Sequence, residues 1–213
     1  MGPSAAIVVA AGGGTRFGAA KQFSTLAGER LVDRAVAAAT AACDTVVLVL
    51  PADTSWDGAP VDVVVPGGAT RAGSVRGGLA AVPAGTDVVV VHDAARPLAT
   101  PALFAAVIAA VRAGADAAVP AVAVVDTIKR VDPIGRVHET VPRETLVAVQ
   151  TPQAFRVDAL RDAHAAEGDA TDDAALVEAA GGTVVVVPGD DRNLKVTTAL
   201  DLIVAAALLG AAS

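Results

Sequence analysis

A glycine-rich loop followed by two cations is the part of the sequence best suited to chemistry. Three glycines at 12–14 follow an apolar run at 5–9, and Arg16 and Lys21 come shortly afterwards. A backbone without side chains can approach a ligand closely and direct several N–H groups at it. Phosphate oxygens need donors from several directions, and nearby cations neutralise their charge. The pattern therefore predicts a polyanion-binding site at the end of the apolar run.

Two better-known glycine loops do not fit this stretch. The P-loop, Gly-x-x-x-x-Gly-Lys-[Ser/Thr], fails because Ala19 and Ala20 follow Gly18 where the lysine and the hydroxyl belong. The dinucleotide fingerprint, Gly-x-Gly-x-x-Gly, fails because Phe17 stands at its third glycine position. A tight turn that carries a solvated arginine and lysine is the structural alternative.

The composition restricts the class of protein and its ligands. The chain has 213 residues, of which 54% are hydrophobic, and this suits one α/β domain with a sizeable core. Aromatic residues are scarce and the net charge is −7, so binding to nucleic acid or to an anionic membrane is disfavoured. The lone Cys43 excludes an intrachain disulfide and a cysteine-cluster metal site. We recognise no signal peptide and no membrane-spanning run, so we expect a cytoplasmic location.

Apolar, valine-rich runs alternate with alanine-rich helical patterns along most of the chain. Strands are predicted at 5–10, 45–50, 61–65, 87–92, 117–120 and 183–187, and helices at 31–42, 70–81, 101–113 and 157–166, with two more capped by Thr171 and starting near Thr198. Continuously apolar strands between helices are typical of a mostly parallel open sheet in a three-layer α/β fold. Ligands of such sheets bind at the carboxyl ends of the strands. Motifs that directly follow strands are therefore candidates for function.

Two further motifs follow predicted strands. Thr70 is placed to cap a helix, and Arg71 beside it would point into the crevice of the glycine loop. Asp93 can contact a metal-bound phosphate or substrate hydroxyls, and Arg96 can bind a phosphate in fork geometry. The alternatives are an ordinary helix cap and a structural Asp–Arg pair. His92 is expected to pack at the end of its strand rather than to catalyse.

Residues 122–145 interrupt the alternation of strands and helices. A strand-like run at 123–131, a turn signature at 132–135 and a returning run at 136–141 predict a β-hairpin. Such a hairpin has little core of its own, so it must pack on something, often on a partner subunit. A solvated hairpin is the alternative interpretation.

Taken together, the motifs resemble those of the 2-C-methyl-D-erythritol 4-phosphate cytidylyltransferase family of the non-mevalonate isoprenoid pathway. The resemblance covers nearly the whole chain. It rests on the motifs at 10–18 with Lys21-Gln22, 91–97, 126–129, 150–153, 171–174 and 193–197. Each motif is weak alone, but their order and spacing together are highly specific.

The resemblance implies a fold and an activity. Members are nucleotidyltransferases of a Rossmann-like, glycosyltransferase-A-like type, and their β-arm, here 122–145, joins two subunits into a homodimer. The resemblance thus implies a single domain over 1–213. The implied reaction joins CTP to 2-C-methyl-D-erythritol 4-phosphate and releases pyrophosphate, with Mg²⁺ bound to the CTP phosphates. A phosphate monoester is already a competent nucleophile, so the reaction needs alignment and charge neutralisation rather than a catalytic base.

The family pattern also assigns roles to single residues. Arg16 and Lys21 would be catalytic, because they would neutralise charge that grows on the CTP phosphates. Contacts to CTP are expected from Ala11, Gly12, Gly13, Gly68, Ser74 and Lys195. Contacts to the acceptor are expected from Asp93, Arg96, Thr127, Arg143 and Thr151, again with Lys195. No metal ligand is predicted.

Two departures and two alternative functions stay open at this point. Ala20 precedes Lys21 where many members have proline, and Ala69 stands where some carry an acidic residue. Closure of the loop over CTP and the contacts to cytosine are therefore not fixed by the resemblance. A cytidylyltransferase for another polyol phosphate, such as ribitol 5-phosphate, is the nearest alternative. A non-catalytic nucleotide-binding regulator is disfavoured because Arg16 and Lys21 are both present.

Overall fold

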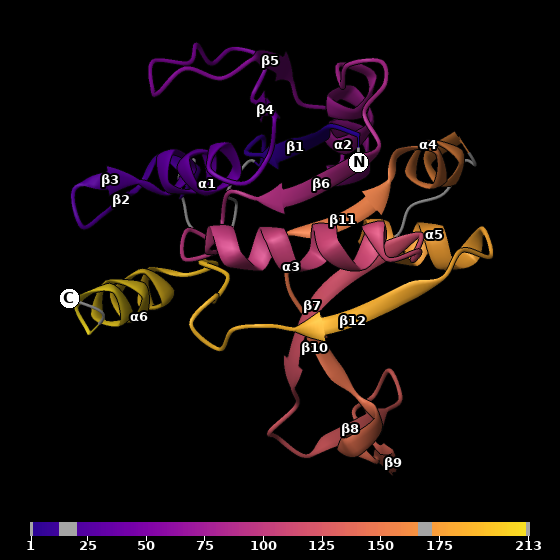
Figure 1. The fold of residues 1–213 in the computed structure, drawn as a ribbon. Helices are drawn as coiled ribbons and strands as arrows, with labels where there is room; N and C mark the ends of the chain where they lie inside the picture. Colours follow the sequence, from indigo (N-terminus) through magenta and orange to yellow (C-terminus); the bar gives the residue numbers. More distant parts are fainter. Residues whose placement is uncertain (1, 13–20, 166–171, 212–213) are drawn as a thin grey trace.

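The computed structural model describes residues 2–12, 21–165 and 172–211. Its elements in chain order are β1 (Ser4–Val9), η1 (Lys21–Phe23), β2 (Thr25–Leu26), β3 (Glu29–Arg30), α1 (Leu31–Thr40), β4 (Thr45–Leu50), β5 (Val63–Pro66), α2 (Arg71–Ala80), β6 (Val88–Asp93), α3 (Pro101–Arg112), β7 (Ala117–Ala123), β8 (Ile128–Val131), β9 (Val137–Val141), η2 (Arg143–Thr145), β10 (Val147–Val149), β11 (Gln153–Arg156), α4 (Val157–Ala165), α5 (Asp173–Ala179), β12 (Val184–Pro188) and α6 (Ala199–Gly210). Helices lie on both faces of a twisted sheet, and a small hairpin projects from one end (Figure 1).

The main sheet is open and mostly parallel, as the sequence predicts. Its strand order is β10-β7-β11-β6-β1-β4-β5, and β12 pairs with β7. β1 is parallel to β6 and β4, β4 is parallel to β5, and β12 is parallel to β7. β11 runs antiparallel between β6 and β7, and β10 is antiparallel to β7. The sequence analysis missed these two antiparallel strands and the short β2–β3 pair.

The central strands are buried on both faces. Alternate residues of β1 contribute to two apolar clusters, one under α1 and α3 and the other under α2, α4 and α5. Ala6 and Val8 belong to the first cluster, and Ala5 and Ile7 belong to the second. Small aliphatic side chains fill these layers because the chain has so few aromatic residues. The tight packing fixes the ends of β1 and β6, where the predicted site residues lie.

The polar residues that begin the helices satisfy their first free N–H groups. The Thr70 hydroxyl accepts a hydrogen bond from the first turn of α2, as predicted, and Thr198 forms a capping box with Asp201 in α6. The predicted cap of α5, Thr171, lies outside the described residues; Asp172 is the residue whose side chain caps that helix. None of the described helices is long and apolar enough to cross a membrane.

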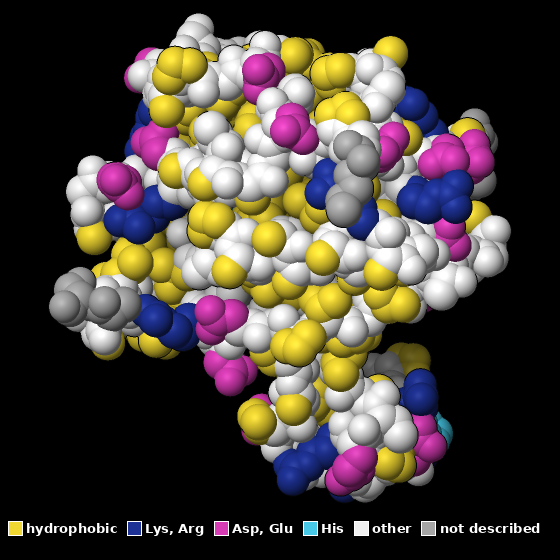
Figure 2. Space-filling view, viewed as in Figure 1, with side chains coloured by type: hydrophobic (Ala, Val, Ile, Leu, Met, Phe, Trp, Pro, Cys, Tyr) yellow, Lys and Arg dark blue, Asp and Glu magenta, His cyan; other side chains and the backbone are white. Residues whose placement is uncertain are grey.

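The predicted hairpin forms and protrudes from the sheet. β8 and β9 pair only with each other, and hydrophobic and charged side chains lie side by side on the lobe they form (Figure 2). Val125 and Ile134 are 77% and 74% exposed, and Arg143 is tied to this lobe by a hydrogen bond to the Val125 carbonyl. We call residues 122–145 the arm.

His92 packs at the end of β6, as predicted. Its side chain is fully buried, its ring centroid lies 5.1 Å from that of Phe104, and its Nδ1 lies 3.1 Å from Thr151 Oγ1. Burial disfavours the charged imidazolium and lowers the pKa of His92 to about 4.

This lowered pKa predicts a loss of stability on mild acidification. In the unfolded chain His92 takes up its proton near pH ~6.5, so between that pH and about 4 the unfolded state holds more protons than the folded state. The free energy of unfolding therefore falls as the pH drops, and His92 accounts for about 2 kcal/mol between pH 7 and pH 5.

The measurement is urea unfolding at both pH values. His92→Asn should be less stable than the parent at pH 7 but should lose about 2 kcal/mol less on acidification. His138→Gln is the matched control, because that imidazole is 61% exposed on the arm. An unchanged pH dependence in His92→Asn would contradict the prediction.

Candidate functional site

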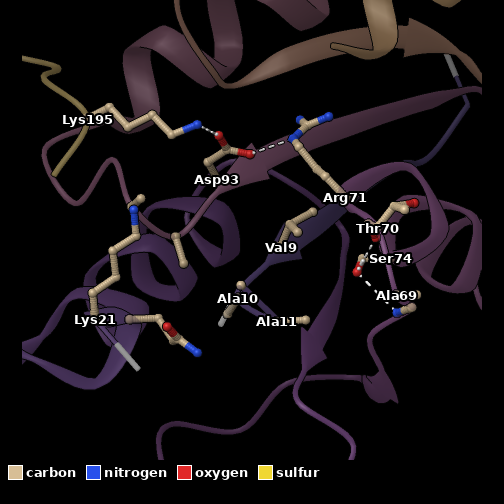
Figure 3. A pocket seen from close by; sticks show the side chains of 15 residues that line it. Val9, Ala10, Ala11, Lys21, Ala69, Thr70, Arg71, Ser74, Asp93 and Lys195 are labelled. Carbon is tan, nitrogen blue, oxygen red and sulfur yellow. Dashed lines mark hydrogen bonds and ion pairs between the residues drawn. The ribbon is translucent and has the colours of Figure 1, made fainter. Parts of the chain in front are cut away.

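A pocket of about 250 Å³ opens at the carboxyl ends of β1 and β6, beside the first turn of α2 (Figure 3). It is lined by Val9, Ala10, Ala11, Gly12, Lys21, Gln22, Gly68, Ala69, Thr70, Arg71, Ser74, Asp93, Ala94, Ala95 and Lys195. Parallel sheets bind their ligands at this edge. The pocket therefore lies where the sequence analysis expects the site.

The structure brings together many of the residues predicted to contact a ligand. Those that line the pocket are Ala11, Gly12, Lys21, Gly68, Ser74, Asp93 and Lys195. Two other predicted residues, Gly13 and Arg16, lie outside the described part of the chain. The remaining predicted residues, Arg96, Thr127, Arg143 and Thr151, are not among the lining residues.

One wall of the pocket is a tight turn between β5 and α2. The Gly68 N–H donates to Ser74 Oγ at 3.1 Å, and the Ser74 hydroxyl donates to the Thr70 carbonyl at 3.0 Å. A Cβ on Gly68 would lie 2.7 Å from the carbonyl carbon of Gly73, which is closer than atoms can pack. Glycine is therefore required here by a backbone contact, and the turn presents a smooth wall of backbone and small side chains.

Asp93 lies between two cations at the floor of the pocket. Its Oδ2 lies 2.6 Å from Lys195 Nζ, and its Oδ1 lies 3.2 Å from Arg71 Nε (Figure 3). Burial alone would raise the pKa of Asp93, but Arg71 and Lys195 outweigh burial and hold the pKa below its usual range. Asp93 is therefore a carboxylate at neutral pH, and its remaining lone pairs can accept hydrogen bonds from a ligand.

Arg71 is held from its other side by a carboxylate that the sequence analysis missed. Its Nη1 lies 2.7 Å from Oδ2 of Asp173, and Asp173 Oδ1 lies 3.0 Å from Nε2 of His164. Burial lowers the pKa of the Arg71 guanidinium, but Asp93 and Asp173 outweigh burial and raise it above its ordinary value. The signal in the sequence was a doubled aspartate at 172–173, where only a helix cap is predicted.

Lys21 and Lys195 extend into the pocket from the same side (Figure 3). Lys21 is the first residue of η1, and its Nζ donates to the Val196 carbonyl at 2.9 Å. This hydrogen bond joins the segment that carries Lys21 to the segment that carries Lys195, and both lysines line the pocket. Together with Arg71 they give the described part of the pocket more positive than negative charge, in a protein that is acidic overall.

The other predicted residues lie near the pocket or on the arm. Arg96 donates to the carbonyl of Asn193 at 2.7 Å, whereas Asp93 pairs with Arg71 and Lys195, so the structural Asp–Arg pair considered above does not form. Burial lowers the pKa of the Arg96 guanidinium. Thr151 is buried beneath Asp93, and its hydroxyl accepts a hydrogen bond from the Asp93 N–H at 3.1 Å. Thr127 and Arg143 belong to the arm.

The fold and the pocket define an α/β protein with a cation-rich pocket at the carboxyl edge of a mostly parallel sheet. A family model described as "IspD: 2-C-methyl-D-erythritol 4-phosphate cytidylyltransferase" matches residues 4–211. The chain belongs to this family.

Similar proteins include both proteins of about this length and longer, bifunctional ones. A 2-C-methyl-D-erythritol 4-phosphate cytidylyltransferase of Saccharopolyspora erythraea is 47% identical, over 96% of this chain and 98% of its own length. A bifunctional enzyme IspD/IspF of Clavibacter michiganensis is 49% identical over 92% of this chain, which spans only 52% of that protein. The crystal structure of 2-C-methyl-D-erythritol 4-phosphate cytidylyltransferase from Thermus thermophilus superposes with a TM-score of 0.84 at 35% identity, over 96% of this chain and 98% of that one.

The steric constraint on Gly68 leads to a prediction about stability. Gly68→Ala must push the turn away from Gly73, and we expect a loss of about 1–3 kcal/mol of unfolding free energy. Gly77→Ala is the matched control within α2, because its new Cβ would meet only the Pro66 carbonyl oxygen at 3.5 Å. That variant should be neutral or up to about 1 kcal/mol more stable. Urea unfolding of the two variants measures the difference, and equal stabilities would contradict the argument.

Proposed function

We propose that this protein transfers the cytidylyl group of CTP to 2-C-methyl-D-erythritol 4-phosphate and releases pyrophosphate. Membership of the family supports the reaction. The observation that carries the proposal is the pocket at the carboxyl edge of the sheet, where Lys21 joins Asp93 and its two cations, Arg71 and Lys195, in the lining. Such a pocket can hold two anions and a group of hydroxyls at the same time.

The chemistry needs alignment and neutralisation. A phosphate oxygen of the acceptor attacks the α-phosphorus of CTP, a new P–O bond forms, and the bond to the β-phosphate oxygen breaks, so that pyrophosphate leaves with the electron pair. Lys21, together with Arg16, would neutralise the charge that grows on the α-phosphate and on the leaving group. A side-chain base is unnecessary because the attacking phosphate is already ionised.

The nucleotide would lie along the turn between β5 and α2. Gly12, Gly68 and Ser74 leave only small side chains and backbone groups on this wall. A two-ring base would be crowded there, and backbone groups that pair with the cytosine edge would lose partners with other bases. This arrangement favours CTP over ATP and GTP.

The acceptor would bind on the side of Asp93 and Lys195. The Asp93 carboxylate can accept hydrogen bonds from the acceptor hydroxyls, and Lys195 can bind its phosphate. Arg96 and Thr151 do not line the pocket, and they would support the groups that bind the acceptor. Thr127 and Arg143 lie on the arm, so we propose that they reach the acceptor across a dimer interface.

Mg²⁺ fits this pocket as an ion carried by the nucleotide. Mg²⁺ in nucleotide sites is held mainly by phosphates and water, with one or two carboxylates from the protein. Asp93 is the carboxylate among the described lining residues, and no group of three metal-binding side chains occurs in the described part of the chain. The ion would reduce the repulsion between the two phosphorylated substrates, and Asp93 is the residue that would help to hold it.

The test of the reaction is pyrophosphate release from the purified protein. We expect release with CTP and 2-C-methyl-D-erythritol 4-phosphate, and a much lower kcat/KM with ribitol 5-phosphate, ATP or GTP. A higher kcat/KM with ribitol 5-phosphate would assign the protein to the alternative acceptor. No release with any acceptor would refute catalysis.

The two cations of the N-terminal segment should be needed for turnover but not for folding. Removing a charged contact made mainly in the transition state should cost ~3–4 kcal/mol, so Lys21→Ala and Arg16→Ala should each lower kcat roughly 10²–10³-fold. Arg161→Ala is the control, because Arg161 is exposed on α4. Steady-state kinetics with a thermal unfolding check measures the effect, and near-normal turnover of either cation variant would overturn the assignment.

A shared active site can be tested by mixing two inactive proteins. If Arg143 serves the neighbouring subunit while Lys21 serves its own, Lys21→Ala and Arg143→Ala chains complement each other. Unfolding the two together and refolding them makes about half of the dimers mixed. Each mixed dimer then has one site with an intact body and an intact arm.

Random exchange should therefore restore about a quarter of the wild-type activity. Pull-down with a tag on one variant confirms that exchange took place. If the arm served its own subunit, every site would keep one defect, and a mixture that stays inactive after confirmed exchange would rule out the shared site.

A further inference from the structure

A chain of five charged or polar side chains runs from the protein interior into the pocket. His164 at the end of α4 contacts Asp173 at the start of α5, at 3.0 Å. Asp173 contacts Arg71 at 2.7 Å, Arg71 contacts Asp93 at 3.2 Å, and Asp93 contacts Lys195 at 2.6 Å. These side chains link α4, α5, α2, β6 and the segment before α6, and the last three of the five line the pocket.

The two inner members of this set of five side chains are far more buried than Arg71 and Lys195. The side chains of His164 and Asp173 are 2% and 1% exposed, whereas those of Arg71 and Lys195 are 30% and 41% exposed. Leu160, Ala163, Ala174 and Val177 pack in the same apolar cluster, so the α4–α5 corner is closely packed. A buried carboxylate needs partners, and Asp173 has two.

Arg71 is placed at some energetic cost. It is the first residue of α2, and a cation at a helix N-terminus opposes the helix dipole. Two carboxylates compensate, and each contacts a different nitrogen: Nη1 contacts Asp173 and Nε contacts Asp93. With Nη1 anchored to α5, the guanidinium is held with its Nε edge toward Asp93 (Figure 3).

We propose that Asp173, supported by His164, is a positioning residue for the acceptor side of the pocket. Asp173 holds the Arg71 guanidinium beside Asp93, and this keeps the Asp93 carboxylate ionised and oriented between Arg71 and Lys195. Asp173 does not line the pocket, so it acts through Arg71. The proposal rests on the proposed function, because it concerns the groups that would hold the acceptor.

The first experiment compares Asp173→Asn with Asp172→Asn. The two aspartates are adjacent, but Asp172 caps α5 and contacts Gln153 rather than Arg71, and asparagine caps helices as well as aspartate does. Asp173→Asn should lower kcat about tenfold or more, as is usual for a residue that orients a site group, while the KM for CTP changes less than about threefold. Asp172→Asn should keep parental kinetics. Equal kinetics for the two variants would overturn the proposal.

The second experiment separates positioning from a general loss of structure. If Asp173 acts through Arg71, then Asp173→Asn added to Arg71→Ala should cause no further fall in kcat. If Asp173 had a purely structural role, the fold-decreases in kcat of the two single variants would multiply in the double variant. His164→Leu should lower kcat in the same direction, and His164→Gln, which keeps an N–H donor, should recover most of that loss. Multiplying effects, or no effect of His164→Leu, would contradict the proposal.

The third measurement does not depend on activity. The ¹⁵Nε–Hε NMR signal of Arg71, identified by its loss in Arg71→Ala, should exchange slowly with water in the parent and in Asp172→Asn. It should exchange faster in Asp173→Asn. If the parent protein releases no pyrophosphate, the proposed function fails, yet this comparison still decides whether Asp173 positions Arg71. Unchanged exchange in Asp173→Asn would refute the positioning role by itself.

Discussion

The structure of the site depends on one ion cluster, the Asp93 carboxylate between Arg71 and Lys195. The cluster joins a central strand, the first turn of a helix and a loop near the end of the chain. A carboxylate that is 11% exposed is unfavourable unless it is paired, and two cations that project into one crevice repel each other unless an anion lies between them. Each partner therefore requires the others, and together they fix the relative positions of three pocket walls.

Small side chains are the second condition for this geometry. A Cβ on Gly78 would lie 2.5 Å from Cγ2 of Ile7, so only glycine lets α2 approach β1 this closely. The backbone of α2 at Gly78 therefore lies directly on the Ile7 side chain, and Arg71 and Ser74, at the start of the same helix, lie at the edge of the pocket. A core of valine, alanine and leucine permits such contacts because its layers are thin.

Sequence reasoning predicted the parallel part of the sheet because valine runs between helical patterns have few other solutions. It missed β11, since Gln153–Arg156 is a short stretch whose strand structure depends on the neighbouring strands β6 and β7. Lys21, Asp93 and Lys195 were predicted because each lies in a motif next to a strand or helix end, and all three line the pocket. The contact between Arg71 and Asp173 was not predictable, because the two residues are 102 positions apart and each has a sufficient local explanation. Proximity along the chain also suggested Arg96 as the partner of Asp93, whereas tertiary packing supplies Arg71 and Lys195.

The segment before α6 gives the pocket an order of assembly. Val196 accepts a hydrogen bond from Lys21 and donates one to the Ala95 carbonyl at 2.8 Å, so this segment is joined to η1 and to the residues that follow β6, which come much earlier in the chain. During synthesis the sheet from β1 to β6 can form while the segment is still within the ribosome. Asp93 then lacks Lys195, Arg71 lacks Asp173, and the pocket lacks one wall. A nascent chain can thus have formed much of its sheet and still be unable to hold its ligands until the segment around Lys195 and Val196 has joined it.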